Sequence, residues 1–268
     1  METGELLGST PRRQGASGPW CTLAPASRGS VARQYLASAD FTKHSENLRV
    51  ARQGLIQIQR AHKDAIRDGN EAAVTTLARV HGLQIGIVAE AWIRKVIADP
   101  NGFNDRERSY LRQARSRIDT WSMTVDLAFR RHFSVPLHLE IDQHTTNMVT
   151  ATQFATISGL ITSELAPVIE DRNKVAHAQW AWHLNSRETQ FTRPAPMPIN
   201  YSALLSRAKL IRAIGQIVTV LTLSGWTFQR DYDNLVAQVR SAQAGLDGSY
   251  YEEFKRRLIE RAKKGQAD

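Results

Sequence analysis

A helical pattern over residues 71–98 constrains the fold most, because it is apolar over more than half of its circumference. Apolar side chains recur there at spacings of three and four residues, which places them on adjoining faces of one α-helix. The side chains expected to be buried are Val74, Leu77, Val80, Ile85, Val88, Ala91 and Trp92. A helix this apolar needs neighbours on several sides, so we predict that it is the central helix of a bundle. Gly82 and Gly86, four residues apart, would let a neighbouring backbone approach this helix closely.

Apolar stripes with helical spacing recur along the rest of the chain. They occupy residues 40–67, 105–131, 204–221, 231–246 and 250–264, and one further helix begins at Thr145 or Thr146 and buries side chains as far as Leu165. Pro167 is expected to strain or end that helix, because proline has no N–H to donate and crowds the preceding turn. His62 lies on the stripe of residues 40–67 and is interpreted as a residue at the edge of the core.

Strand patterns are nearly absent from the sequence. Residues 134–142 contain Pro136 and predict a loop, and residues 185–200, with three prolines, predict a loop or a short hairpin followed by a loop. We therefore predict an all-α fold, an up-and-down helical bundle of about six to eight helices. A single helical domain is expected over residues 36–268. Residues 1–35 are expected to form a disordered tail, since the first 30 are rich in Gly, Ser, Pro and Ala without periodicity.

The composition favours a polyanionic partner. The net charge is +9 and the isoelectric point is about 10.0. A membrane surface is the competing explanation, but no stretch approaches 18 uninterrupted apolar residues, so nucleic acid is preferred and no membrane association is expected. The single Cys21 excludes a disulfide framework and a cysteine zinc site, which favours a reducing cytoplasm. The sequence has no Gly-rich phosphate loop and no metal-ligand spacing, so neither a cofactor nor a metal is expected.

Three arginines form a row within residues 105–131. Arg108, Arg112 and Arg115 are spaced by four and three residues, which would align them on one face of a helix. Such a row is either a solvated face paired with nearby acids or a track for the RNA backbone, where each neutralised phosphate releases counterions.

The residues best suited to chemistry lie in the segment 172–177. Asn173 and His177 are one helical turn apart, and Arg172 lies about 100° to the side of Asn173. Histidine changes its charge near neutral pH, and the planar fork of arginine donors suits phosphate oxygens. This combination points to phosphodiester chemistry without a metal, and the alternative is an interfacial histidine beside a solvated arginine.

This segment also resembles the signature of HEPN domains, which is an Arg, four residues and a His. A polar residue after the Arg and a small residue before the His, here Asn173 and Ala176, are the favoured variant in that family. The resemblance covers about 40 residues, from Thr145 to His183. It implies an all-α domain with an HEPN-like core at about residues 70–225 and a C-terminal helical extension at 226–268.

The resemblance further implies a function and partners. Members of this family of ribonuclease toxins and anti-phage effectors dimerise and bring two motifs into one cleft that cuts RNA without a metal. The resemblance implies that Arg172 and His177 are catalytic and that Asn173 and Lys174 position the substrate. It also implies three kinds of partner: RNA, a second copy of the chain, and an antitoxin or other regulatory protein. Some relatives bind RNA or proteins without cutting, so a non-catalytic HEPN-like module is an alternative, and a helical DNA-binding structural protein is another. A Tyr that a nucleotidyltransferase modifies in many relatives is Gln179 here, which weakens that partnership.

Overall fold

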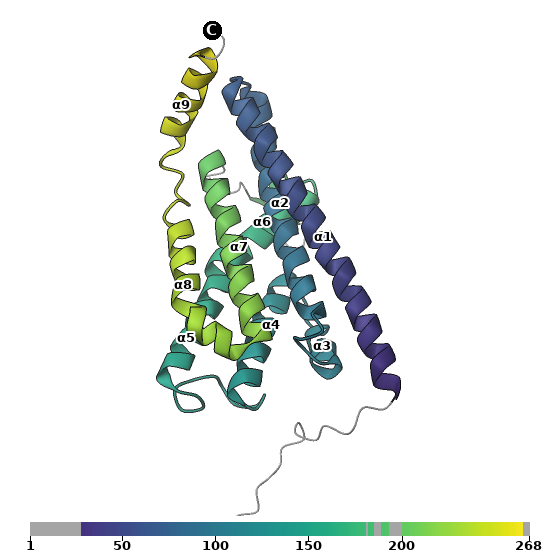
Figure 1. The fold of residues 1–268 in the computed structure, drawn as a ribbon. Coiled ribbons are helices and arrows are strands. Elements are labelled where there is room, and N and C mark those ends of the chain that lie inside the picture. The colour runs from purple at the N-terminus through teal and green to yellow at the C-terminus, as the bar shows by residue number, and fades with distance from the viewer. Residues whose placement is uncertain (1–27, 181, 185–188, 193–199, 265–268) are drawn as a thin grey trace, which may run out of the picture.

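The computed structural model describes residues 28–180, 182–184, 189–192 and 200–264, and these form an all-α bundle as predicted (Figure 1). The helices are α1 (Arg28–Arg67), α2 (Glu71–Ala98), α3 (Asp105–Leu111), α4 (Arg117–Phe133), α5 (Met148–Leu160), a π-helical turn (Ile161–Leu165), α6 (Ala166–Ala176), α7 (Tyr201–Leu223), α8 (Gly225–Gln243) and α9 (Tyr251–Lys264). Cys21 and most of the expected tail lie outside the described residues.

The first two helices form an antiparallel pair that runs the length of the molecule (Figure 1). They are joined by a tight turn in which Gly69 has the left-handed φ of 68° and Asn70 caps α2 by accepting from the Ala73 N–H at 3.1 Å. The helix predicted over residues 71–98 is therefore confirmed. The predicted tail is wrong for residues 28–35, because α1 already begins at Arg28.

The single helix predicted over residues 105–131 is wrong, because the chain breaks between α3 and α4. The Ser116 hydroxyl accepts from the Asp119 N–H at 3.0 Å, so Ser116 starts a new helix instead of continuing the old one. A serine followed three residues later by an acid is a helix start signal that the apolar periodicity masked.

The segment from α5 to α6 bends where proline was expected to disturb it. α5 is capped by Asn147, which accepts from the Thr150 N–H at 2.9 Å, and not by Thr145 or Thr146 as predicted. The chain then widens into the π-helical turn Ile161–Leu165, and α6 starts with Pro167 in its first turn, where a missing N–H is tolerated because first-turn N–H groups have no partner within the helix. The expectation about Pro167 is confirmed.

The C-terminal part contains the hairpin and the last three helices. β1 (His183–Leu184) and β2 (Phe191–Thr192) pair antiparallel in a two-stranded sheet, and the prolines expected in the following loop lie outside the described residues. Ser224 ends α7 and also caps α8 by accepting from the Thr227 N–H at 3.2 Å. α8 therefore begins at Gly225, and the predicted start near Asp231 is wrong.

One hydrophobic core takes buried side chains from each of the helices α1 through α8. It includes fully buried Ile85, Trp121, Phe129, Leu204 and Phe228. Because it reaches from Leu48 to Ala242, the core extends beyond residues 70–225 on both sides. By length and composition alone α2 could cross a membrane, but in this structure it packs against α1, α6 and α7.

Histidines in α1 and α2 are part of this interior. His62 and His81 are both fully buried, and their Nδ1 atoms are 3.5 Å apart. Both rings contact Tyr201 of α7, which stacks on Phe254 of α9 with 5.2 Å between ring centroids. Placing His62 at the edge of the core is therefore wrong, since it is fully buried and contacts His81 of α2 and Tyr201 of α7.

Candidate active site around Arg172 and His177

Arg172 of α6 is held by a carboxylate of the central helix. Its Nη2 donates to Glu90 Oε2 at 2.6 Å, and its Nη1 donates to the Asn173 side-chain oxygen at 2.8 Å. The Arg172 side chain is 28% exposed and that of Glu90 is 14% exposed. The Arg172 Nε is buried without a hydrogen-bond partner in the described part of the chain. The guanidinium is therefore fixed, with one of its polar atoms still unused.

Glu90 forms ion pairs with three arginines. Its Oε1 accepts from Arg94 Nη2 at 2.6 Å and from Arg117 Nε at 2.8 Å, while Oε2 binds Arg172. Burial acts to raise the pKa of Glu90, but Arg172, Arg94 and Arg117 outweigh it and lower that pKa below its usual value. Three positive charges facing one negative charge leave a local surplus of positive charge at the junction of α2, α4 and α6.

A glycine allows α6 to come this close. A Cβ placed on Gly86 would lie 2.4 Å from the Arg172 Cβ, which real atoms do not tolerate. Gly86 is one turn before Glu90, so both face α6. The expected close approach is thus confirmed at Gly86, whereas a Cβ on Gly82 would meet only Leu204, at 3.8 Å.

His177 lies at the C-terminal end of α6. The helix closes with the Gln179 N–H bonded to the Lys174 carbonyl at 2.9 Å and the Ala178 N–H bonded to the Val175 carbonyl at 3.2 Å. This Schellman arrangement requires a left-handed residue after the cap, and Ala178 takes that conformation with φ 61°. The His177 side chain is exposed and makes no hydrogen bond to another described residue.

The structure brings some of the predicted site residues together. Arg172 and Asn173 are in contact, and the His177 N–H bonds to the Asn173 carbonyl at 3.0 Å. Arg172 points toward α2, while the His177 ring is exposed, and the structure records no contact between these two side chains. Lys174 is half-buried beside them. A single subunit therefore offers a fixed cation and an accessible imidazole on one helix, without a direct bond between them.

Two tryptophans follow His177 at the surface. Trp180 is 39% exposed and Trp182 is 52% exposed, so neither belongs to the core. The Trp180 ring nitrogen donates to the Val175 carbonyl at 3.0 Å, which holds it against the end of α6. Exposed aromatic faces next to a histidine can stack on bases or pack against a partner.

The acids nearest in sequence to the motif do not hold Arg172. Glu164 accepts from Gln243 at 2.7 Å, and Asp171 lies 4.0 Å from Arg207 of α7. Sequence reasoning missed Glu90, the acid that does. Glu90 lies between Ala89 and Ala91 in the apolar second half of α2, and a carboxylate in such a position signals a cation partner, because a buried charge needs one. Among the described residues, no three His, Cys, Asp or Glu side chains gather into a group that could hold a metal ion.

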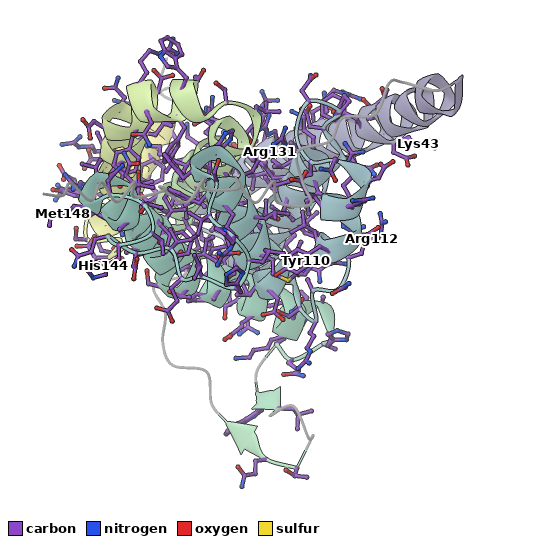
Figure 2. The ribbon with its side chains drawn as sticks, turned by 90° about the horizontal axis from the view of Figure 1, so that it is seen from below. Lys43, Tyr110, Arg112, Arg131, His144 and Met148 are labelled. Atoms are coloured by element: carbon purple, nitrogen blue, oxygen red, sulfur yellow. The ribbon has the colours of Figure 1, made fainter. Side chains whose placement is uncertain are left out.

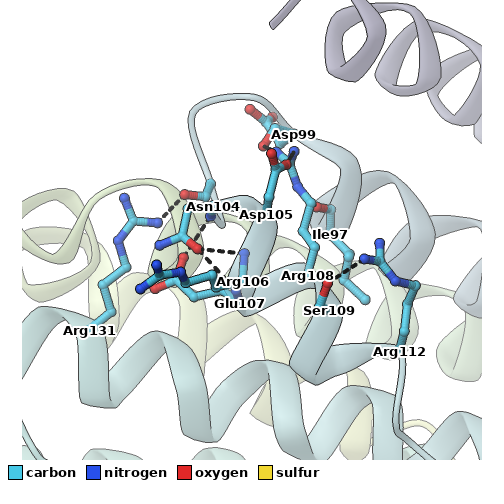
Figure 3. A network of polar contacts seen from close by, with 11 residues as sticks. Ile97, Asp99, Asn104, Asp105, Arg106, Glu107, Arg108, Ser109, Arg112 and Arg131 are labelled. Carbon is cyan, nitrogen blue, oxygen red and sulfur yellow. Dashed lines mark hydrogen bonds and ion pairs between the residues drawn. The ribbon is translucent and has the colours of Figure 1, made fainter. Parts of the chain in front are cut away.

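The arginine row predicted on one helix does not exist, because the helix breaks after Leu111. Arg108 of α3 is only 13% exposed and donates to the carbonyls of Ile97 and Asp99 at 3.0 and 2.9 Å (Figure 3). Arg112 is the C-cap of α3 and donates to the Ser109 hydroxyl at 2.6 Å. Arg115 is exposed in the turn before α4. Arg108 is thus a structural clamp, and Arg115 lies beyond the helix that carries Arg108 and is capped by Arg112.

Comparison with known proteins finds no matching family model, no similar curated protein and no similar solved structure. The resemblance to HEPN domains rests on residues 172–177 and their surroundings alone.

Proposed function

We propose that this chain is a metal-independent endoribonuclease of the HEPN type that acts in the cytoplasm as a toxin or defence effector. The observation that carries the proposal is the pairing of a fixed, partly buried Arg172 with an exposed His177 at the end of the same helix. A rigid guanidinium suits phosphate binding, and an unpartnered imidazole is available for proton transfer. The net charge of +9 and the surplus of arginines around Glu90 favour an RNA substrate.

In the proposed reaction the ribose 2′-hydroxyl supplies the nucleophile. Its oxygen forms a bond to the adjacent phosphorus while the bond from phosphorus to the 5′ oxygen breaks. His177 accepts the 2′ proton or protonates the leaving 5′ oxygen, and Arg172 neutralises charge that develops on the non-bridging oxygens. Asn173 and Lys174 position the phosphate. The products are a 2′,3′-cyclic phosphate and a 5′-hydroxyl end.

The chemistry favours a homodimer as the active unit. One proton must leave the 2′ oxygen and another must reach the 5′ oxygen, whereas one motif supplies one histidine. A second subunit related by two-fold symmetry would supply the other histidine, if its segment 172–177 lies opposite that of the first subunit. The exposed Trp180 and Trp182 are the proposed anchors of this interface.

A specific observation favours a second candidate, a non-catalytic HEPN-like module that binds RNA or a regulatory protein. Glu90 and Asn173 already occupy two nitrogens of Arg172, which is the arrangement expected of a structural role in the free subunit. In that case RNA binding would persist without cleavage. A third candidate, a structural protein that binds DNA, has only the basic charge in its favour.

Cleavage of a single-stranded RNA with and without a chelator of divalent ions tests the proposal. We expect cleavage that survives the chelator and leaves cyclic phosphate ends, and a loss of about 10²–10⁴-fold in rate for His177→Ala. His144→Ala, which alters an exposed histidine in another loop, is the matched control and should cleave normally. Toxicity on expression that Arg172→Ala relieves would separate the nuclease from both alternatives. Cleavage that requires magnesium, or that His177→Ala leaves unchanged, would contradict the proposal.

Mixed subunits test the composite site. Heterodimers of Arg172→Ala and His177→Ala chains should have activity unlike either parent, because each site would combine different intact groups. A strict monomer by light scattering that cleaves at full rate would rule out the shared site.

A further inference from the structure

A pocket of about 350 Å³ opens among α1, α2, α3 and α4, apart from the Arg172 side chain. Polar side chains from all four helices line it, namely His44, Arg94, Arg108, Arg112, Arg117 and Thr120. Asp40, at its rim, is the acid among the described lining residues. A pocket of this size lies at the small end of the range for small-molecule sites.

The pocket carries more positive charge than its neighbours neutralise. Arg94 and Arg117 share the single carboxylate of Glu90 with Arg172. Arg112 is bonded to a neutral hydroxyl, that of Ser109, and no acid pairs with it among the described residues. Asp40 is itself 3.4 Å from Lys43. The lining therefore favours an anion.

The helix ends around the pocket also favour an anion. The C-terminal carbonyls of α2 would repel an anion, but the Arg108 guanidinium bonds to the carbonyls of Ile97 and Asp99 (Figure 3). Arg117 and Thr120 belong to the first turn of α4, whose N-terminal end carries a partial positive charge. Both effects lower the cost of placing negative charge in the pocket.

The arginines keep donors available for a ligand. The side chains of Arg94 and Arg117 are 46% and 43% exposed, and each pairs with Glu90 through one nitrogen. Arg112 is exposed, and Figure 2 shows it at the molecular surface on the side of Lys43, away from His144 and Met148. A guanidinium with free N–H groups binds phosphate oxygens in a forked geometry.

We infer that this pocket is a phosphate-binding site that takes a mononucleotide-sized ligand, with Arg94, Arg112 and Arg117 holding the phosphate. The volume accommodates more than a phosphate ion, and the apolar side chains of Ile97 and Leu111 supply a surface for an uncharged part of the ligand. Arg94 and Arg117 share Glu90 with Arg172, so the pocket adjoins the proposed active site. The inference does not depend on the proposed ribonuclease activity, because it concerns ligand binding and not cleavage.

Calorimetric titration of the full chain with AMP tests the site, with adenosine and inorganic phosphate as companion probes. AMP should bind, adenosine should bind at least tenfold more weakly, and inorganic phosphate should compete with AMP. Arg112→Gln should weaken AMP binding by about tenfold, since a hydrogen bond to a charged group is lost. Arg115→Gln, which removes an exposed arginine outside the lining, should leave the affinity unchanged.

Arg112 is chosen because its substitution leaves the Glu90 cluster intact, so that a folded variant is expected. Arg112→Lys, which keeps the charge but loses the fork, should fall between wild type and Arg112→Gln. The inference is overturned by absence of AMP binding, by equal binding of adenosine, by failure of phosphate to compete, or by equal losses in Arg112→Gln and Arg115→Gln. Phosphate and AMP of equal affinity would overturn the mononucleotide part of the inference, because the nucleoside would then make no contact with the pocket.

Discussion

Arg172 and Glu90 are 82 residues apart in sequence, yet their side chains meet at 2.6 Å across the contact of α6 with α2. Because Glu90 is largely buried and also binds Arg94 and Arg117, its loss leaves three cations without their shared partner. We expect Glu90→Gln to lower the free energy of unfolding by about 3 kcal/mol, which is the low end for breaking a buried ion pair. The low end applies because Arg94 and Arg117 are partly exposed and stay hydrated without Glu90. Urea unfolding monitored by circular dichroism measures this change.

Glu253→Gln is the matched control for this substitution. Glu253 makes one exposed pair with Arg257 in α9, so the expected change is under about 0.5 kcal/mol. Equal stability of Glu90→Gln and Glu253→Gln would show that the Glu90 cluster does not hold α6 in place.

The contact of α6 with α2 also depends on Gly86. Gly86→Ala would force its Cβ against Arg172, so we expect it to destabilise the chain by about 1–3 kcal/mol, as overpacking does. Gly82→Ala meets only Leu204 at 3.8 Å and should stabilise by up to about 1 kcal/mol, since alanine is the better helix former. Thermal unfolding of the two variants compares them directly. Opposite signs are required, and a stabilising Gly86→Ala would contradict the tight packing.

The periodicity of apolar residues is enough to predict α2, α7 and α9 closely, because α2 and α7 bury several faces and α9 carries one half-buried stripe. It fails between α3 and α4. Leu111 and Trp121 are both buried, so the stripe continues across a break that only the Ser116 cap reveals. A local cap can end one helix and start another while the apolar spacing continues, so the spacing alone does not reveal the break.

The candidate site likewise has a part that the sequence predicts and a part that it does not. Arg172, Asn173 and His177 are neighbours in sequence, so their spacing on one helix can be predicted. Glu90 and Gly86 reach Arg172 only through tertiary packing. The arginines of the pocket likewise come from three helices, and neither their convergence nor the burial of Arg108 follows from spacing.

The end of α6 predicts a pair of substitutions with opposite effects. Ala178 is exposed in a left-handed conformation that costs a residue with a Cβ about 1 kcal/mol, so Ala178→Gly should stabilise by up to about that amount. Ala176, also exposed but inside the helix, should lose about 1 kcal/mol on substitution by Gly. Chemical denaturation measures both. Destabilisation by Ala178→Gly would contradict the left-handed cap that precedes the hairpin and follows His177.

The buried histidines predict a loss of stability in mild acid. Burial lowers the pKa of His62 to about 4, and burial together with the charge of His62 lowers the pKa of His81 to about 4, from an ordinary 6.5. Between pH 6.5 and 4 the unfolded chain therefore binds protons that the folded chain does not, so stability is fully present above pH 6.5 and falls as the pH drops through this window. The loss is up to about 3 kcal/mol for each histidine.

The slope of unfolding free energy against pH separates this effect from other titrations. His62→Gln removes one titrating ring, so it should reduce the slope between pH 6.5 and 4.5 whatever its effect on absolute stability. The reduction should be less than about half, because burial also lowers the pKa of His132, which contributes to the slope. His138→Ala, at an exposed loop position, should retain the wild-type slope. Carboxylates contribute chiefly below this range, where the pKa of Glu90 is itself lowered. An unchanged slope in His62→Gln would mean that the two rings are hydrated in solution, and the packing of Tyr201 against them and Phe254 would then have to be open.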